Sequence, residues 1–566
     1  MSAQGRPEGE SFERQREGSP VNAPVPPIWT TGSTEVFKTG SWRAALPRHI
    51  QAPSPCHAAC PVNGDIAEWI GRARARDFRG AWEVLTRHNP FPAIAGRICH
   101  HPCETACNRA GFDEALSICK LERFVGDRAL AEGWSFARPE REQRERIAVV
   151  GGGPSGLSAA FQLRRLGYQV TLFEAQGELG GLMRHGIPAY RLARDVLDGE
   201  IARIVALGVE VRCGAPLGAP ADLQRLRETY DAVYLATGAR RQKRLPQLDY
   251  SQPWVMDGAE YLAQSSLGAP PALGRRVVVI GGGSAALDVA RSARRAGHEV
   301  TIVALEPESQ MPAQREEVEE ALEEGIELVA GSMLTAATAG SGGVRLDLVR
   351  VRFEAGQARG QFRVTPLPGS GFARAADAVV PSIGQDPDLA PLSALAADGS
   401  LLQVDARLAT SAERVYAGGD VASMARFVTE AVGMGKRAAW QIDRALRAAD
   451  EASVGDEAEV ALNRIATAYY PKQARAATAR LAAAERLASD TEVQLGLALE
   501  AALAESNRCF SCGTCVFCDN CVNYCPDLAV KRTDHGYRVL DDYCKGCGLC
   551  VKECPTGSMK MVEEAR

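Results

Sequence analysis

The chain has 566 residues, of which 46% are hydrophobic and 24% charged, so wholesale disorder and collagen-like repeats are excluded. Its net charge of −5 argues against a polyanion-binding surface, and we therefore expect no nucleic-acid partner. No apolar run approaches the roughly 18 residues that a membrane-spanning helix needs, and the polar start lacks signal-peptide architecture, so we expect a cytoplasmic protein without membrane contact.

The 17 cysteines gather at the two ends of the chain. Six lie between residues 56 and 119 and ten between 509 and 554, which leaves Cys213 alone in the middle. A disulfide scaffold is typical of short secreted chains, and the reducing cytosol opposes it. Clustered thiolates in this setting indicate bound metal.

Residues 1–46 are rich in Pro, Gly, Ser and charge, which predicts an extended arm. In 65–88, apolar residues recur three and four places apart, as they do on one face of a helix. We therefore expect a small helical domain over 47–145, built around the N-terminal cysteines.

The middle of the chain holds an internal repeat of strand, glycine turn, helix and strand, starting at Ile147 and again at Val277. The glycines of the first unit (Gly151, Gly153 and Gly156) precede a helix whose first N–H groups can face a pyrophosphate. Glu174 ends the next strand, where a carboxylate can accept a ribose hydroxyl. The second unit has Gly281 and Gly283, with Ala286 in third place. The repeat predicts two dinucleotide sites; the alternative is a glycine turn without a ligand.

Residues 451–508 are Ala-rich, which predicts a helical connector, and 509–566 form a cysteine-rich tail. Two tail runs share the spacing C-x2-C-x2-C-x3-C followed by Pro, which is the bacterial ferredoxin pattern for two 4Fe-4S clusters. The fourth cysteine of each run reaches across to the other cluster. The expected sets are Cys515, Cys518, Cys521 with Cys554, and Cys544, Cys547, Cys550 with Cys525. A zinc ribbon is the alternative, and Cys509 and Cys512 are surplus, either alternative ligands or structural.

Several longer motifs resemble one family over nearly the whole chain, from about Cys56 onward. They include CPVNGDIAEWI, GRICHHPCETACNR, GELGGLMRHGIPAYRL, YDAVYLATGA and VYAGGDVASMARFVTEAVGMG. The chain is similar to the glutamate synthase small-subunit-like FAD and NAD(P) oxidoreductases, whose relatives include dihydropyrimidine dehydrogenase and NADH-dependent ferredoxin:NADP oxidoreductase. The resemblance implies a multidomain α/β protein with a helical Fe-S domain, tandem Rossmann-like domains and an α+β ferredoxin-like tail (509–566).

The resemblance also assigns the two nucleotides. FAD is expected in 146–272 and 377–450, and the nicotinamide nucleotide in the inserted domain 273–376. The implied FAD contacts are Gly151, Gly153, Ser155, Gly156, Glu174, Gly181, Leu182, Arg191, Leu217, Gly238, Gly419, Asp420 and Thr429. The implied nicotinamide-nucleotide contacts are Gly281, Gly283, Ser284, Ala285, Glu306, Ile383 and Gly384.

Family members with two N-terminal clusters carry an extra C-x2-C pair before the position of Cys56, and this chain has none there. One complete set remains, Cys60, Cys99, Cys103 and Cys107, so we expect one N-terminal 4Fe-4S cluster and three clusters in all. Cys56 and Cys119 are left over. They are either inert buried thiols or part of a second site with non-cysteine ligands.

NADPH-using relatives have two adjacent arginines where this chain has Leu305 and Glu306. A carboxylate repels a 2′-phosphate and accepts from a free ribose hydroxyl. We therefore expect a preference for NAD(H) over NADP(H).

Hydride carries two electrons, whereas a cubane cluster passes one, and a flavin converts between the two. The expected function is electron transfer among NAD(H), FAD, 4Fe-4S clusters and a low-potential redox protein, with no side-chain acid or base and thus no catalytic residue. The direction of flow is open. The segments TGSWRAALP (39–47) and YCKGCGLCVKECP (543–555) resemble the ferredoxin-like subunit of 2-oxoacid:ferredoxin oxidoreductases, which favours a hetero-oligomer with such an enzyme. Alternatives are a stand-alone NAD(P)H:ferredoxin oxidoreductase, a glutamate synthase small subunit, a sulfite-reductase-linked reductase and a non-catalytic electron-wire scaffold.

Overall fold

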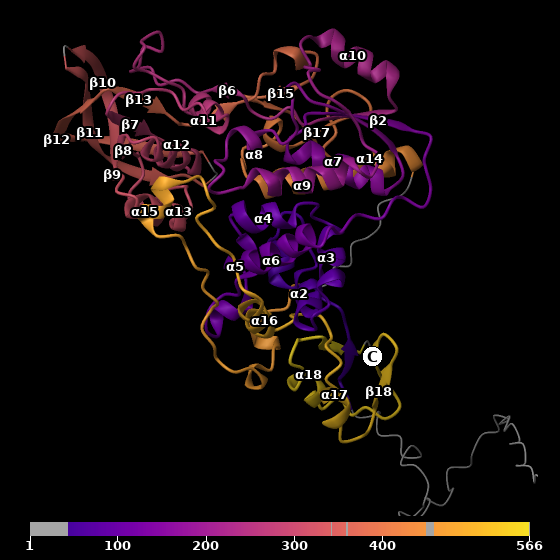
Figure 1. Ribbon diagram of the computed structural model, residues 1–566. Helices are drawn as coiled ribbons and strands as arrows, with labels where there is room; N and C mark the ends of the chain where they lie inside the picture. The colour runs from indigo at the N-terminus through magenta and orange to yellow at the C-terminus, as the bar shows by residue number, and fades with distance from the viewer. Residues whose placement is uncertain (1–42, 341, 358–359, 449–457, 565–566) are drawn as a thin grey trace, which may run out of the picture.

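The computed structural model describes residues 43–340, 342–357, 360–448 and 458–564 (Figure 1). A helical domain lies in the centre, two sheet-containing domains lie on one side of it, and the cysteine-rich tail lies on the opposite side. This arrangement confirms the predicted multidomain α/β fold. Among the described residues, no helix combines the length and apolar character needed to cross a membrane.

The helical domain packs its helices around two buried tryptophans, Trp69 and Trp82. Helices α4 and α6 approach closely at two glycines: a Cβ on Gly96 would meet the backbone of Arg123 at 2.3 Å, and one on Gly126 the backbone of Ala93 at 2.2 Å. The helices are α1 (Pro55–Ala59), α2 (Ile66–Arg74), α3 (Phe78–Thr86), α4 (Pro92–Ile98), α5 (Pro102–Thr105), η3 (Asn108–Gly111) and α6 (Ile118–Ala131).

The first sheet is parallel throughout, in the order β17-β5-β2-β3-β4. Its strands are β2 (Arg146–Val150), β3 (Gln169–Phe173), β4 (Glu210–Arg212), β5 (Ala232–Leu235) and β17 (Val415–Ala417). The accompanying helices are α7 (Pro154–Arg165), α8 (Leu182–His185), α9 (Arg194–Val205), α10 (Pro220–Thr229) and α14 (Val428–Arg447). Strand β17 returns to this sheet only after the second domain, so that domain is an insertion.

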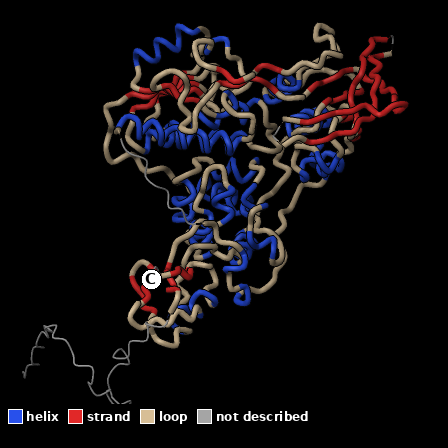
Figure 2. Tube along the Cα trace, turned by 180° about the vertical axis from the view of Figure 1, so that it is seen from behind, coloured by secondary structure: helices blue, strands red, loops and turns tan. Residues whose placement is uncertain are grey.

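The inserted domain repeats the parallel plan in the order β13-β7-β8-β9, and an antiparallel sheet β10-β11-β12 projects beyond it (Figure 2). The strands are β7 (Arg276–Ile280), β8 (Glu299–Val303), β9 (Glu327–Val329), β10 (Ser332–Gly340), β11 (Gly343–Ala355), β12 (Phe362–Ala376) and β13 (Ala378–Pro381). The helices are α11 (Gly258–Ser266), α12 (Ser284–Arg295) and α13 (Arg315–Glu323). Short pairs β6 (Arg241–Gln242) with β14 (Gln385–Asp386), and β15 (Ala397–Asp398) with β16 (Leu401–Leu402), complete the strands near the connections between the domains.

The tail consists of α17 (Asn520–Asn523), β18 (Val530–Thr533), β19 (Gly536–Val539), α18 (Leu549–Lys552) and β20 (Met559–Glu563). Strand β1 (Ala45–His49) pairs antiparallel with β20, and Arg43 forms an ion pair with Glu564. The residues around the predicted boundary at 46 therefore belong to the tail's sheet. The rest of the predicted arm, 1–42, lies outside the described residues.

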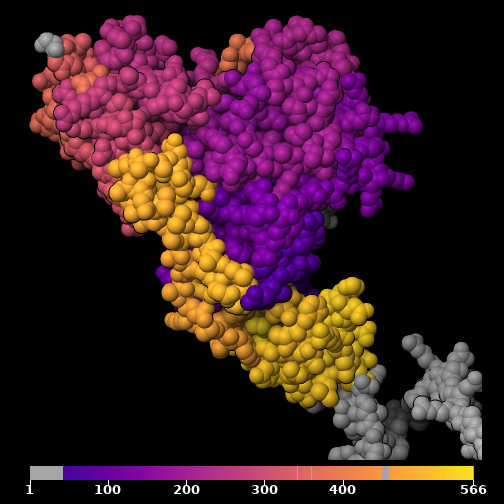
Figure 3. Space-filling model, viewed as in Figure 1, coloured from indigo at the N-terminus to yellow at the C-terminus, as the bar shows by residue number. Residues whose placement is uncertain are grey.

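The connector differs from the helical segment that its composition predicts. Its helices are short, α15 (Ala483–Ala488) and α16 (Leu499–Asn507), and the stretches between them cross the surface from the inserted domain to the tail (Figure 3). The backbone N–H of Val493 donates to the carbonyl of Tyr190, and that of Ala476 to the Glu505 carboxylate. Tertiary partners thus satisfy backbone groups that a helix would have paired internally, and they override the helix propensity of alanine.

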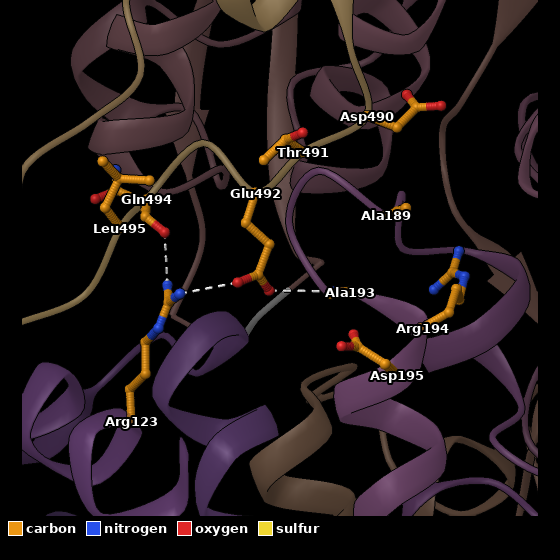
Figure 4. A pocket seen from close by; sticks show the side chains of 10 residues that line it. All are labelled: Arg123, Ala189, Ala193, Arg194, Asp195, Asp490, Thr491, Glu492, Gln494 and Leu495. Carbon is orange, nitrogen blue, oxygen red and sulfur yellow. Dashed lines mark hydrogen bonds and ion pairs between the residues drawn. The ribbon is translucent and has the colours of Figure 1, made fainter. Parts of the chain in front are cut away.

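Glu492 fixes the middle of the connector. Its carboxylate accepts from the guanidinium group of Arg123 and from the backbone N–H of Ala193 (Figure 4). It also accepts from the guanidinium group of Arg97. Beside it lies a cavity between 490–495 and 189–195, and no residue predicted to hold a cofactor lines this cavity.

Candidate functional site

The first glycine turn joins β2 to α7 and leaves no room for side chains. A Cβ on Gly151, whose φ is +113°, would meet the carbonyl oxygen of Ala236 at 2.2 Å, and one on Gly156 would meet that of Gly151 at 1.8 Å. Gly153 instead caps α7 and faces open space toward Gly181. The first turn of α7 is therefore exposed to a ligand that lies across Gly153, as a pyrophosphate does at such a helix terminus.

Glu174 lies beside this turn at the end of β3. One oxygen of its buried carboxylate accepts from the Gly152 N–H at 2.8 Å, and the other accepts from the Gln176 N–H at 2.8 Å. These bonds orient the carboxylate at the edge of the turn. The placement suits a ribose diol next to the pyrophosphate site.

The returning strand β17 brings a second glycine pair to the same place. Gly419 has φ +73°, and a Cβ there would meet Cβ of Ser155 at 2.9 Å, so the backbone after β17 touches the start of α7. Asp420 follows, with Arg426 at 3.9 Å from its carboxylate. Nearby, Oγ1 of Thr237 is buried and has no hydrogen-bond partner among the described residues. Glycine backbone, an acidic residue and an unpaired hydroxyl therefore lie beside the first glycine turn, and these groups fit a flavin dinucleotide.

Helix α14 begins beside these groups and touches the helical domain. Oγ1 of Thr429, in its first turn, lies 3.6 Å from Sγ of Cys99 and accepts from it. The ring of Phe427, the residue before α14, stacks on His100 at 3.6 Å between centroids. A predicted cluster ligand and a predicted flavin contact are thus neighbours.

The second glycine turn joins β7 to α12 in the same way. A Cβ on Gly281 would meet the carbonyl oxygen of Ser382 at 2.3 Å, whereas Gly283 has open space around it. Glu306 is half-buried, and Oε2 lies 2.5 Å from the place that a Cβ on Gly282 would take. Burial raises the pKa of Glu306. The turn and carboxylate reproduce the arrangement of Gly152 and Glu174.

Most other residues implied by the resemblance border these two turns. Gly181 contacts Gly153, with a Cβ there only 2.9 Å from the Gly153 Cα. Leu182 is exposed in α8, and Leu217 is half-buried against the core cluster that contains Val150. Gly238 has a φ of +71°. Ser284 and Ala285 are the first residues of α12, and Ile383 and Gly384 follow β13. Arg191 differs: its guanidinium forms ion pairs with Asp288 and Glu317 of the inserted domain, so it bridges the two domains.

The N-terminal cysteines divide into two groups. The thiol of Cys103 interacts electrostatically with Cys60 and Cys99 and with the carboxyl of Glu122. Glu122 is enclosed, accepts from Asn89 at 2.7 Å, and has its pKa raised by burial to about 7. Three of the four predicted ligands are thus together, with a carboxyl group beside them.

The fourth predicted ligand, Cys107, lines a different cavity. Cys56, Cys509 and Cys512 surround this cavity with it. Sequence reasoning left these last three unassigned because their common site joins residues more than 400 positions apart. The C-x2-C spacing marked Cys509 and Cys512, whereas no such spacing marked Cys56. Cys119 lies beside Cys99 on another cavity and is buried, with Sγ 3.6 Å from the Ala95 carbonyl.

The tail cysteines form the two predicted sets. Cys515, Cys518, Cys521 and Cys554 line one cavity. The other four, Cys525, Cys544, Cys547 and Cys550, interact electrostatically with one another. The crossing of the fourth cysteine between runs is therefore present in the fold.

The C-x2-C-x2-C-x3-C spacing of the tail thiols is that of ferredoxins, in which the cysteines bind separate irons of a cubane, whereas zinc usually takes its four ligands as two separated pairs. The spacing therefore fits clusters better than zinc. Among the described residues, no three His, Cys, Asp or Glu side chains converge on the position of one metal ion.

Three family comparisons agree with this geometry. Residues 145–435 match the pyridine nucleotide-disulphide oxidoreductases, residues 47–134 match the dihydropyrimidine dehydrogenase domain II 4Fe-4S cluster family, and residues 537–560 match the 4Fe-4S binding domain.

Curated relatives extend the similarity to most of the chain. The NADP(+)-dependent formate dehydrogenase subunit beta of Moorella thermoacetica is 35% identical over 497 residues, covering 81% of this chain and 70% of the relative. The NADPH-Fe(3+) oxidoreductase subunit beta of Geobacter sulfurreducens is 31% identical, covering 81% and 75%. The NAD-dependent dihydropyrimidine dehydrogenase subunit PreT of Escherichia coli is 31% identical, covering 70% and 92%.

Proposed function

The chain belongs to the pyridine nucleotide-disulphide oxidoreductase family, and from that premise we propose that it carries electrons between NAD(H) and the active site of a partner subunit. It is an NAD(P)H-dependent oxidoreductase with FAD and several 4Fe-4S clusters. The relatives above are named as subunits, which supports a hetero-oligomer.

The contact between Cys99 and Thr429 is the observation that carries the proposal, because it joins a predicted cluster ligand to the helix that begins beside the predicted flavin site. When bound, the flavin exchanges hydride with a nicotinamide and single electrons with a cluster. The residues of this chain would bind and orient the flavin dinucleotide. Gly153 and the first turn of α7 hold the pyrophosphate, Glu174 the ribose, and Asp420 the chain that leads to the flavin ring.

We propose that the inserted domain favours NAD(H). Glu306 stands beside Gly282 as Glu174 stands beside Gly152, and each is suited to a free ribose diol. A 2′-phosphate at Glu306 would meet a carboxylate and no bidentate cation. Two of the relatives are named for NADP or NADPH and one for NAD, so the proposed preference rests on Glu306 and not on the names of the relatives.

Glu122 supports a cluster ligated by three cysteines and one carboxylate. Since Cys107 lines the neighbouring cavity, we propose Cys60, Cys99, Cys103 and Glu122 as the set nearest the flavin. The carboxyl group is enclosed with Asn89 as its hydrogen-bond partner. A metal would hold it as the anion.

The 2-oxoacid oxidoreductase stays a prediction for the partner. The relatives reported above are named for formate, Fe(3+) and dihydropyrimidine, and none for a 2-oxoacid. Stand-alone ferredoxin reduction, glutamate synthase, sulfite-reductase-linked activity and an electron-wire scaffold are the competing outcomes.

Anaerobic purification from native cells, with mass spectrometry of every co-purifying chain and counts of flavin and iron, tests the proposal. We expect about one FAD per chain and a second oxidoreductase subunit. A thiamine-diphosphate enzyme in the complex would identify the 2-oxoacid partner. A chain that is free of flavin and purifies alone would contradict the proposal.

A further inference from the structure

One cavity brings together cysteines from the two ends of the chain. Cys56 lies in α1, Cys107 precedes η3, and Cys509 and Cys512 follow α16. Apart from these thiols the lining is largely apolar, with Ile66, Ala67, Ile70, Leu116, Ile118 and Phe510. The Cys56 thiol interacts electrostatically with the other three. We infer that these four cysteines hold an additional 4Fe-4S cluster, which neither of the matched 4Fe-4S families covers with its full ligand set.

The loop from Cys509 to Cys512 has the backbone of the ferredoxin loops. Its third residue, Ser511, has φ +51° and donates its N–H to Sγ of Cys509 at 3.4 Å. Gly546 repeats this geometry, with φ +71° and an N–H 3.4 Å from Sγ of Cys544. A left-handed residue after the first cysteine is uncommon unless it is glycine. Ser511 therefore adopts a strained backbone conformation that directs its N–H toward the sulfur of Cys509, as the loops of cluster-binding proteins do.

The site that contains Cys99 has the same arrangement of a left-handed residue and an N–H directed at sulfur. His101 has φ +40°, and its N–H lies 3.2 Å from Sγ of Cys99. In the mixed cavity, Nδ2 of Asn108 donates to Sγ of Cys512 at 3.4 Å, and Oγ of Ser54 lies 3.1 Å from Sγ of Cys56. Three of the four sulfurs thus have hydrogen-bonding partners, and such bonds stabilise cluster thiolates and set the potential.

Buried ion pairs and hydrogen bonds hold the segment around Cys107 against the segment around Cys509. Arg109 donates to the carbonyl of Arg508 at 2.8 Å and forms an ion pair with Asp113. Arg508 in turn donates to the same carboxylate and to the carbonyl of Glu114. These contacts flank Cys107 and Cys509 and hold both on one cavity.

The position of this cluster connects the other sites. Cys107 is four residues from Cys103, and Cys512 is three residues from Cys515. At about 3.6 Å per residue, the second pair is no more than about 11 Å apart along the chain. If the proposed function holds, electrons pass from the flavin through the N-terminal site and this cluster to the tail. The N-terminal cluster and the tail clusters then lie on one route.

The test compares cysteine variants at both ends of the full chain, purified anaerobically. The native chain should contain about 16 iron per chain, four for each of four clusters. Cys56→Ser and the double variant Cys509→Ser with Cys512→Ser should each lose about a quarter of the iron and the same electron paramagnetic resonance signal. The flavin content should not change. Cys213→Ser, an exposed cysteine outside every group, is the matched control and should keep all the iron.

Native protein with about 12 iron, or loss of different signals from the two ends, would overturn the inference. The iron count and signals do not require NADH, so they are independent of the proposed function. In the double variant, NADH should still reduce the flavin, while only dithionite should reduce the tail clusters. If the native protein contains four clusters but NADH does not reduce its flavin, the proposed function is wrong and the inference of the additional cluster still holds.

Discussion

The carboxylate of Glu306 occupies the space in front of Gly282, where a side chain would collide with it at 2.5 Å. The inserted domain thereby places a negative charge at the mouth of its glycine turn. The first sheet does the same with Glu174 and Gly152, where the N–H of the glycine donates to the carboxylate at 2.8 Å. The two halves of the repeat thus share a ribose-binding arrangement.

Replacing Glu306 with Gln tests the nucleotide preference. Because the substitution removes the charge that repels a 2′-phosphate, kcat/KM for NADPH should rise about tenfold, equivalent to about 1.4 kcal/mol, with little gain for NADH. Steady-state kinetics with both nucleotides gives the ratio. Glu308→Gln, in the exposed turn nearby, should leave the ratio unchanged. A native enzyme that already prefers NADPH would disprove the role given to Glu306.

Thr429→Val should change the potential of the cluster beside Cys99. A cysteine bound to iron has lost its proton, so the Thr429 hydroxyl would then donate to the sulfur. Loss of that hydrogen bond, worth about 1 kcal/mol, should lower the potential by roughly 40 mV for one electron. A redox titration followed by electron paramagnetic resonance measures this shift. Thr429→Ser should restore the native potential, since it keeps the hydroxyl. An unchanged potential in the Val variant, with full flavin content, would show that the contact does not reach the cluster.

Glu492→Gln should loosen the connector. The carboxylate lies between two guanidinium groups that are almost fully buried, Arg97 and Arg123. Both groups keep Asp127 as a second counter-ion. Loss of the charged acceptor at Glu492 therefore costs about 2 kcal/mol, so the unfolding temperature should fall by a few degrees and proteolysis at 470–495 should accelerate. Asp490→Asn, an exposed neighbour in the same cavity, should behave as the native chain. Equal stability of both variants would contradict the importance of the Glu492 contacts.

Glu200 should make the stability of the α4–α9 contact depend on pH. Burial raises the pKa of this carboxyl to about 8, although it accepts the N–H groups of Ala93 and Ile94. Its folded pKa exceeds its unfolded value, so its contribution is full below about pH 4.5 and is lost as the pH rises toward 8. The free energy of unfolding should fall by up to about 1.4 kcal/mol per pH unit in that window. Denaturant unfolding at several pH values should show this slope, and Glu200→Gln should flatten it. The same slope in both proteins would assign it to other groups.

Local spacing was enough to predict the features that depend on it. The glycine turns at Gly151 and Gly281 and the crossed tail sets follow from patterns of fewer than about 30 residues, because strand, turn and helix are set by neighbours along the chain. The insertion of the second sheet-containing domain into the first was implied by the family resemblance. These predictions needed no knowledge of distant contacts.

What the sequence could not reveal depends on long-range contacts. The pairing of β1 with β20, and of Cys56 with Cys509, joins opposite ends of the chain. The connector was predicted to be helical because alanine favours helices, but its backbone bonds to Tyr190 and to Glu505 decide its course. Arg191 was carried over as a flavin contact, yet its ion pairs lie between two domains that only the fold brings together.

The central claim is that NADH reduces the clusters of this chain through its flavin. An anaerobic titration with NADH, followed by flavin absorbance and by electron paramagnetic resonance, tests it most directly. We predict that the flavin absorbance bleaches and that the signals of reduced clusters appear in the same titration. If dithionite reduces the flavin and the clusters, whereas NADH and NADPH both leave them oxidised, the account is contradicted.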